Sequence, residues 1–244
     1  MDWRGTHYCR SSSIGTEIRE LHEIVYNYYI KMKKKLLFLS FMATCLISFA
    51  QTDLKPISEQ ELPTIKNNIK EKNVSIQTLT CPFVQTKKMA VLKEDNVMTG
   101  IMYYQRPNQF RWEYTGDKPF VFVQTGEKYY TKVNDKVTEI KENGARQFKE
   151  ISKLVIASMN GDILENTKNF KTEFLQNSSM VVVTLTPIQK AMQNALSKII
   201  LHFNKTTQLV TKIEIFEGSD DITTIQFENN KVNQPINQNT FELK

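Results

Sequence analysis

Histidine, cysteine and glycine are scarce in this 244-residue sequence, which has three histidines, three cysteines and eight glycines. Beyond residue 50, the only histidine is His202 and the only cysteine is Cys81. A metal site needs several such ligands at suitable spacing, and nucleophilic catalysis needs a base beside a serine or cysteine. We therefore expect no metal, no cofactor and no catalytic residue. An enzyme such as a small hydrolase with a β-barrel core is a minor alternative.

The remaining candidates for chemistry have structural interpretations. His202 lies in the apolar run ILHF, typical of a strand, and Cys81 lies beside Pro82 and Phe83, where a buried, inert thiol is the common outcome. No glycines cluster into a phosphate-binding loop. The acidic pairs at 94–95 and 220–221 fall among turn formers, where solvated side chains are expected rather than acid–base catalysis.

One sign of charge is only slightly in excess. Residues 51–244 contain 25 Lys or Arg against 22 Asp or Glu, so much of the +6 net charge of the whole chain comes from the first 50 residues. Nucleic-acid binding would need lysines and arginines clustered with stacking aromatics on one face. The composition therefore argues against a nucleic-acid partner.

The first 50 residues have the features of export rather than of a folded domain. Lys33–Lys35 and an apolar run precede Ser48-Phe49-Ala50, the pattern of a cleaved signal peptide. We expect translation to start at Met32, with 1–31 a non-native upstream extension, 32–50 the signal peptide and 51–244 the functional domain. A single membrane anchor is an alternative, although the run is short for a span. Lipidation of Cys45 is another.

The exported part alternates short strands with two helical patches. Leu62, Ile65 and Ile69 recur at helical spacing and predict an amphipathic helix over 58–73, with Ser58 and Glu61 as a capping box. A second apolar stripe predicts a helix over 145–159, and a further turn or two follows within 162–168. Eleven strands are expected at 76–90, 97–105, 109–115, 119–124, 127–133, 136–140, 169–176, 179–186, 196–204, 208–217 and 222–229.

An aromatic hairpin at 100–114 is the most distinctive segment of the sequence. Phe110, Trp112 and Tyr114 alternate with charged residues and therefore share one dry face of a strand. Arg106-Pro107-Asn108 separates the two strands as a turn. The preceding strand is apolar on both sides, which indicates either an ordinary packed core or the wall of a ligand cavity. An antiparallel sheet this long must curl to bury a face, and the helices can cover its concave side.

Several segments, taken in order, resemble the LolA family of periplasmic carriers of outer-membrane lipoproteins. FVQTK at 83–87 resembles the family's Phe-x-Gln-x-Lys strand, and 100–114 is similar to its Gly, strand, Arg-Pro-Asn, Phe-x-Trp hairpin. GEKYY at 126–130 is similar to its Asp-Gly-Lys turn, LVIAS at 154–158 to its lid, and 223–243 to its closing strand and tail.

The resemblance covers almost all of 56–244. The pattern of Arg111 and Glu113 around Trp112 is most similar to that of carriers from Bacteroidetes, and also to that of divergent relatives encoded with pigment or glycolipid pathways.

The resemblance implies a mainly β fold, an open, incomplete antiparallel barrel of about eleven strands with an α-helical lid. Arg106 matches the family's arginine before proline, which holds the lid closed through hydrogen bonds to lid backbone. The lid would contain Ile151, Leu154, Val155 and Met159. The acyl chains would lie in a cavity lined by Phe83, Ile101, Tyr103, Phe110, Trp112, Tyr114 and Phe122.

The function implied is that of a monomeric periplasmic carrier. It would take lipoproteins from an inner-membrane lipoprotein-releasing ABC transporter and deliver them to an outer-membrane acceptor. Three alternatives stay open. The cargo could be another lipid or a polyene conjugate, a lipidated Cys45 would make the protein an anchored acceptor in the outer membrane, and a scaffold with a closed core would bind no cargo.

Overall fold

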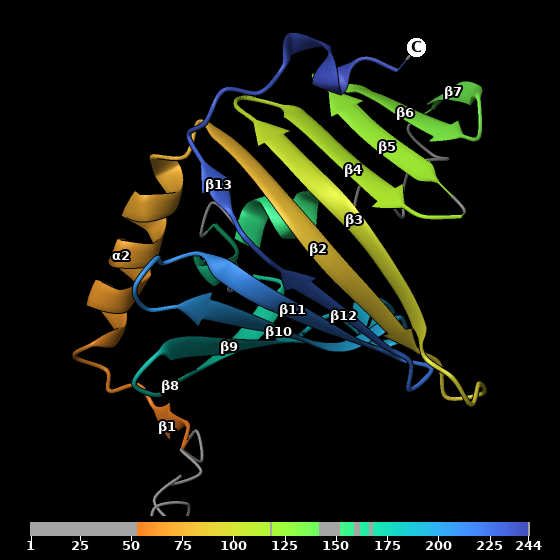
Figure 1. Ribbon diagram of the computed structural model, residues 1–244. Helices are drawn as coiled ribbons and strands as arrows, with labels where there is room; N and C mark the ends of the chain where they lie inside the picture. Colours follow the sequence, from red (N-terminus) through yellow and green to blue (C-terminus); the bar gives the residue numbers. More distant parts are fainter. Residues whose placement is uncertain (1–52, 118, 142–151, 159–161, 166–167, 244) are drawn as a thin grey trace, which may run out of the picture. The chain divides into compact units, whose positions relative to one another are not determined.

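The computed structural model describes residues 53–117, 119–141, 152–158, 162–165 and 168–243 (Figure 1). The predicted upstream extension, signal peptide and Cys45 lie outside the described residues. No helix among those described is both long enough and apolar enough to cross a bilayer.

A single antiparallel sheet of thirteen strands dominates the described chain. Twelve of them follow the order β1-β8-β9-β10-β11-β12-β2-β3-β4-β5-β6-β7, and β13 pairs with β2 outside this order. β1 and β7 are the two ends of this order, so the sheet is open rather than closed into a barrel, as predicted. The strands are β1 (Lys55–Pro56), β2 (Thr78–Lys88), β3 (Asn96–Gln105), β4 (Gln109–Thr115), β5 (Phe120–Thr125), β6 (Lys128–Val133), β7 (Lys136–Ile140), β8 (Phe170–Gln176), β9 (Met180–Pro187), β10 (Leu196–Asn204), β11 (Val210–Glu217), β12 (Ile222–Phe227) and β13 (Lys231–Val232).

The eleven predicted strands correspond to β2 through β12. The two additions, β1 and β13, have two residues each, too few for any alternating pattern to show in the sequence. β13 pairs with the start of β2, and β12 pairs with the rest of the same edge. β2 thereby joins the two halves of the sheet, because β3 runs along its other edge.

The first predicted helix is α2 (Leu62–Val74), which begins four residues later than expected. Pro63 lies in its first turn, where the missing N–H costs nothing. The predicted capping box forms only in part. The Glu61 N–H donates to the Ser58 hydroxyl at 3.3 Å, but it is this hydroxyl that donates to the Glu61 carboxylate, at 2.7 Å. The N-cap residue of α2 is Glu61, which makes no side-chain cap bond. Ile69 is fully buried on the side of α2 that faces the core.

Of the second predicted helix, residues 152–158 are described and are helical. The 3-10 helix η1 (Asp162–Glu165) supplies the further turn that the sequence indicated. Two short elements were not predicted: α4 (Lys190–Gln193) and the 3-10 helix η2 (Gln238–Phe241).

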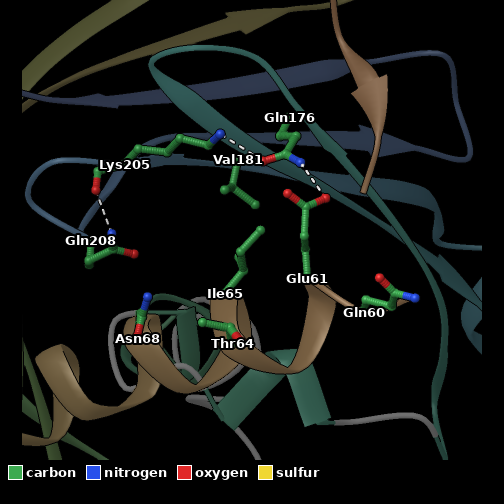
Figure 2. Close-up of a pocket in the computed structure, with 9 residues that line it drawn as sticks. All are labelled: Gln60, Glu61, Thr64, Ile65, Asn68, Gln176, Val181, Lys205 and Gln208. Carbon is green, nitrogen blue, oxygen red and sulfur yellow. Dashed lines mark hydrogen bonds between the residues drawn. The ribbon is translucent and has the colours of Figure 1, made fainter. Parts of the chain in front are cut away.

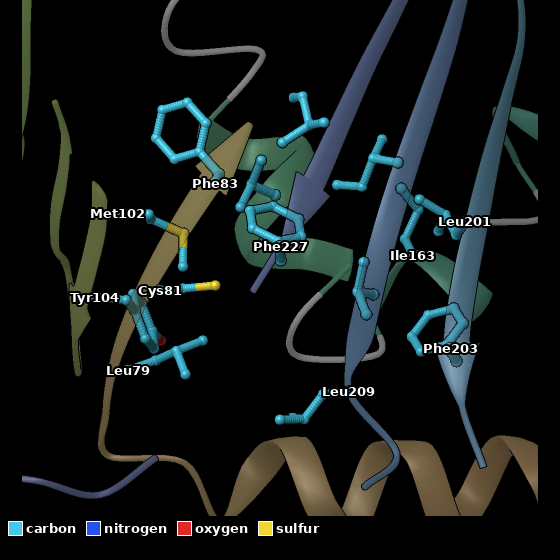
Figure 3. Close-up of a cluster of buried hydrophobic side chains, with 14 of the residues drawn as sticks. Leu79, Cys81, Phe83, Met102, Tyr104, Ile163, Leu201, Phe203, Leu209 and Phe227 are labelled. Atoms are coloured by element: carbon cyan, nitrogen blue, oxygen red, sulfur yellow. The ribbon is translucent and has the colours of Figure 1, made fainter. Parts of the chain in front are cut away.

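The sheet buries side chains on both of its faces. The larger cluster gathers side chains from β2–β6 and β8–β12 together with α2, helix 152–158 and η1, and we call its side of the sheet the inner face (Figure 3). The smaller cluster, on the outer face, contains Val121 and Val123 of β5 beneath Phe241 of η2. The C-terminal segment therefore explains why β5 is apolar on both sides, without any need for a cavity there.

Candidate functional site

An aromatic layer with rings from β2, β4, β5 and β12 lines the inner face across the consecutive strands β12, β2, β3, β4 and β5. The Phe83 and Trp112 rings stack at 3.9 Å between centroids, and Phe110 lies at 6.1 Å from Trp112. Phe122 meets Phe110 edge-on at 6.4 Å, and Phe227 meets Trp112 edge-on at 6.5 Å. Alternate residues of a strand share one face, so Phe110 and Trp112 lie on the same side of β4. Phe122 lies on that side too, because it pairs with Trp112 across β4 and β5.

Gly100 makes room for this layer. It lies opposite Phe83 on one side and Tyr114 on the other, and it is buried. A Cβ atom at this position would overlap both the Phe83 ring and the Glu113 carbonyl oxygen. The glycine of the hairpin motif therefore has a packing role, since it allows the Phe83 ring to lie flat against β3.

Tyr114 lies at the end of the layer and gives it a polar edge. Its ring packs edge-on against Phe83 at 5.6 Å, while its hydroxyl donates to Gln85 Oε1 at 2.8 Å. Burial raises the pKa of Tyr114, so the phenol keeps its proton. The layer is neutral as well as apolar at this end.

Two predicted lining residues do not share this face. Ile101 pairs with Glu113 and Tyr103 pairs with Arg111, so both point to the outer face. Tyr103 packs there against the cluster of Val121, Val123 and Phe241. The inner positions of β3 belong to Met102 and Tyr104, both buried. The sequence could not distinguish the faces, because β3 is apolar on both.

The described part of the predicted lid joins the same cluster as the aromatic layer. Val155 is fully buried and Leu154 packs against the cluster, as do Ile156 and Ala157. The Ser158 hydroxyl is satisfied within the helix by the Leu154 carbonyl at 2.7 Å. The predicted lid residues Ile151 and Met159 lie outside the described residues.

Arg106 lies at the turn between β3 and β4 and reaches the end of α2. Its Nε donates to the Ile76 carbonyl at 2.7 Å, and Nη2 donates to the Asn73 carbonyl at 3.4 Å. A guanidinium suits this place, because carbonyls at a helix C-terminus carry partial negative charge. These contacts fasten the hairpin to α2, and a bond from Arg106 to the lid backbone stays a prediction.

The two titratable groups singled out in the sequence are both packed into the sheet. Cys81 is buried, its thiol donates to Asn230 Oδ1, and burial raises its pKa to about 12. His202 lies on the outer side of β10, with Nε2 2.6 Å from Glu214 Oε1. Burial lowers the pKa of His202.

Among the described residues, no three His, Cys, Asp or Glu side chains gather as metal ligands.

A second feature, which the sequence did not indicate, is a polar recess of about 420 Å³ between α2 and the sheet (Figure 2). Its lining comes from the start of α2, the end of β8, β9 and the β10–β11 turn, segments too far apart in the sequence for any motif to join them. The lining residues are Gln60, Glu61, Thr64, Ile65, Asn68, Gln176, Val181, Lys205 and Gln208.

A family comparison agrees with this architecture. The sequence model of the outer membrane lipoprotein carrier protein LolA matches residues 74–244. The chain belongs to the LolA family. The match begins at the end of α2 and contains the aromatic layer, Arg106, helix 152–158 and the C-terminal segment. The family resemblance found in the sequence is thus confirmed, while the likeness to Bacteroidetes carriers stays a prediction.

Solved structures similar to this LolA-family chain include three from bacteria. A LolA superfamily protein from Nitrosomonas europaea is 12% identical, with a TM-score of 0.35 over 72% of this chain and 96% of its own. Lipoprotein LppX from Mycobacterium tuberculosis is 14% identical, with a TM-score of 0.46 over 74% of this chain and 99% of its own. LprF from Mycobacterium bovis is 13% identical, with a TM-score of 0.42 over 75% of this chain and 97% of its own. The comparison with curated proteins found no match.

Proposed function

We propose that this protein binds the acyl chains of lipoproteins against the aromatic layer and carries them from the inner to the outer membrane. The observation that carries the proposal is that two elements outside the sheet, helix 152–158 and the 3-10 helix η1, contribute apolar side chains to the cluster that contains this layer. Such a cover is small enough for a cargo to replace.

The free energies of burial of the helical cover and of an acyl chain are similar enough for one to replace the other. Burying an aliphatic side chain contributes about 1.5–3 kcal/mol, so Leu154, Val155, Ile156, Ile163 and Leu164 together contribute on the order of 10 kcal/mol. A hexadecanoyl chain gains about 0.8 kcal/mol per methylene on leaving water, or roughly 12 kcal/mol. One acyl chain therefore competes evenly with the helical cover, and two or three chains displace it.

Release of the cargo requires that the helical cover return to the aromatic layer, and we propose that Arg106 favours this return. By holding the hairpin to neighbouring backbone, Arg106 favours the arrangement in which the helical cover occupies the aromatic layer. Cargo that enters must disrupt this arrangement, and the free energy this costs lowers the affinity of the protein for its cargo. The guanidinium suits a latch because it offers five donors in a rigid fork.

The remaining parts of the proposal concern location and partners. A cleaved signal peptide at 32–50 would deliver the chain to the periplasm, where a monomer would receive cargo from an ABC transporter of the inner membrane. An acceptor at the outer membrane would take the cargo over. The family description of an outer membrane lipoprotein carrier supports this order of events. No step in it requires chemistry by the protein.

The test is to purify the protein from the periplasm of its own cells and identify what is bound by mass spectrometry under non-denaturing conditions. The proposal expects an acylated protein in a one-to-one complex. A glycolipid or a polyene ester bound instead would keep the carrier but change its cargo. Recovery without any acylated or lipid ligand, from cells that export lipoproteins normally, would count against a carrier.

A further inference from the structure

We propose that the polar recess defined above binds the uncharged head of the cargo, that is, the ester and amide groups that link the acyl chains to the peptide. This inference rests on the proposed function, since it assumes that the chains themselves lie in the apolar interior. It assigns a separate site, with separate residues, to the polar end of the same molecule.

Most residues that line the recess have side chains that can hydrogen-bond to a neutral group. Gln60, Thr64 and Asn68 are exposed residues of the first turns of α2 and just before it, on the helix side of the recess (Figure 2). Carboxamides and hydroxyls both donate and accept, as esters and peptide amides require of their partners. None of these three side chains is needed for the core.

The two charges in the recess are already balanced. Lys205 Nζ donates to Gln176 Oε1 at 2.7 Å, and Gln176 Nε2 donates to Glu61 Oε2 at 3.4 Å. A phosphate head would meet the Glu61 carboxylate, whose pKa is lowered by its bond from Ser58, and an ammonium head would meet Lys205. A head without net charge therefore fits best.

The floor of the recess connects it to the apolar interior. Ile65 and Val181 point toward each other across the recess (Figure 2), and both also belong to the inner cluster. An amphiphile with its head in the recess can thus pass its chains between these two residues into the cluster. The same arrangement would be of no use to a ligand that is polar throughout.

The volume agrees with a head group of modest size. At about 30 Å³ for each water-sized group, 420 Å³ holds roughly fourteen heavy atoms. A glyceryl diester joined to one amino-acid residue is of that order. The recess is also within the range of pockets that hold small ligands.

The experiment compares two ligands that share long chains but differ in their heads. One is a synthetic dipalmitoyl-glyceryl cysteinyl peptide, acetylated and amidated so that it carries no charge, and the other is the fluorescent polyene fatty acid cis-parinaric acid. Their Kd values are measured for the wild type, for Asn68→Ala and for Gln176→Met. Gln226→Met is the matched control, since Gln226 is exposed on β12 away from the recess.

Asn68 is exposed on a helix, so Asn68→Ala keeps the fold even if Gln176→Met disturbs the end of β8. We expect each recess variant to weaken lipopeptide binding about five- to tenfold, as for one or two lost hydrogen bonds. The Kd for cis-parinaric acid and both Kd values of Gln226→Met stay unchanged.

Unchanged lipopeptide binding in both recess variants would overturn the inference and leave the carrier function standing. Equal weakening of both ligands by both variants would overturn it too, because the effect would then lie in the interior. A wild type that binds neither ligand would overturn the proposed function itself.

Discussion

The rings of Phe83 and Trp112 stack 3.9 Å apart, with an angle of 28° between their planes, although they come from strands that are not neighbours in the sheet. β3 separates the two strands, and the stack crosses it at Gly100, where no side chain intervenes. Three residues from three strands thus form the centre of the aromatic layer.

Gly100→Ala tests this arrangement. Its Cβ would overlap the Phe83 ring and the backbone of Glu113, so one of them must move. We expect a loss of about 1–3 kcal/mol in the free energy of unfolding, as for other overpacked sites. Urea denaturation followed by Trp112 fluorescence measures it. Val97→Thr, an exposed position on the same strand, is the control and should change stability by less than about 0.5 kcal/mol. Equal effects of the two variants would contradict the packing role of Gly100.

Cys81 should be unreactive in the native protein. Burial raises its pKa to about 12, so at about pH 8 the reactive thiolate is on the order of a thousandfold rarer than for an ordinary cysteine. In a background with Cys9→Ser and Cys45→Ser, we expect a thiol reagent to label the chain at least about a hundredfold more slowly in buffer than in urea. Rapid labelling of the folded protein would show that the inner face at β2 is open.

Acid should weaken the outer face of β10 and β11. Burial lowers the pKa of His202, and the neutral ring faces Glu214, which also contacts Lys212 at 2.9 Å. Burial alone would raise the pKa of Glu214, but its bonds from Lys212 and His202 lower it overall. For a lowered pKa, the stabilising contribution is present above the ordinary value, 6.5 for His202, and is lost as the pH falls through the lowered value.

We therefore expect the unfolding free energy to fall between about pH 7.5 and about pH 5.5, and to fall less in His202→Gln, whose side chain does not titrate. Urea denaturation at the two pH values gives the difference. Identical pH dependence in the two proteins would mean that His202 titrates alike in the folded and unfolded chains, contrary to its burial.

Arg106→Leu tests the latch. The variant loses the bonds to the Ile76 and Asn73 carbonyls and should be less stable by about 1–3 kcal/mol. Without the latch, the helical cover competes less well with cargo, so we expect the variant to load lipoprotein but to release it more slowly. Loading from inner-membrane vesicles and transfer to outer-membrane vesicles are measured separately. Arg106→Lys keeps the charge but not the fork and should be intermediate. Unchanged loading and release in Arg106→Leu would exclude the latch.

Much of this fold could be predicted because strand patterns are local. Alternation, turn residues and strand lengths located β2 through β12, and helical spacing located α2 and the segment at 152–158. The outward direction of Tyr103 could not be predicted from the local sequence. It depends on the C-terminal segment, more than a hundred residues away, which provides an apolar cover for the outer face at Phe241.

The site was predictable only in part, for a similar reason. The aromatic residues of β4 revealed their shared face through simple alternation. The recess did not, because residues such as Glu61, Gln176 and Lys205 are ordinary polar residues until the sheet brings α2, β8 and the β10–β11 turn together. The sequence also could not show that the Arg106 side chain reaches the carbonyls of Asn73 and Ile76.

We propose that acyl chains lie against the aromatic layer, and the fluorescence of Trp112 can report whether they do. The other tryptophan, Trp3, is replaced by phenylalanine, so that all tryptophan fluorescence comes from Trp112. Lipopeptide with brominated acyl chains is then titrated into the protein, with the non-brominated lipopeptide as control. We expect strong quenching that saturates at one brominated lipopeptide per protein and is absent with the control. Binding of the brominated lipopeptide without quenching of Trp112 would contradict it.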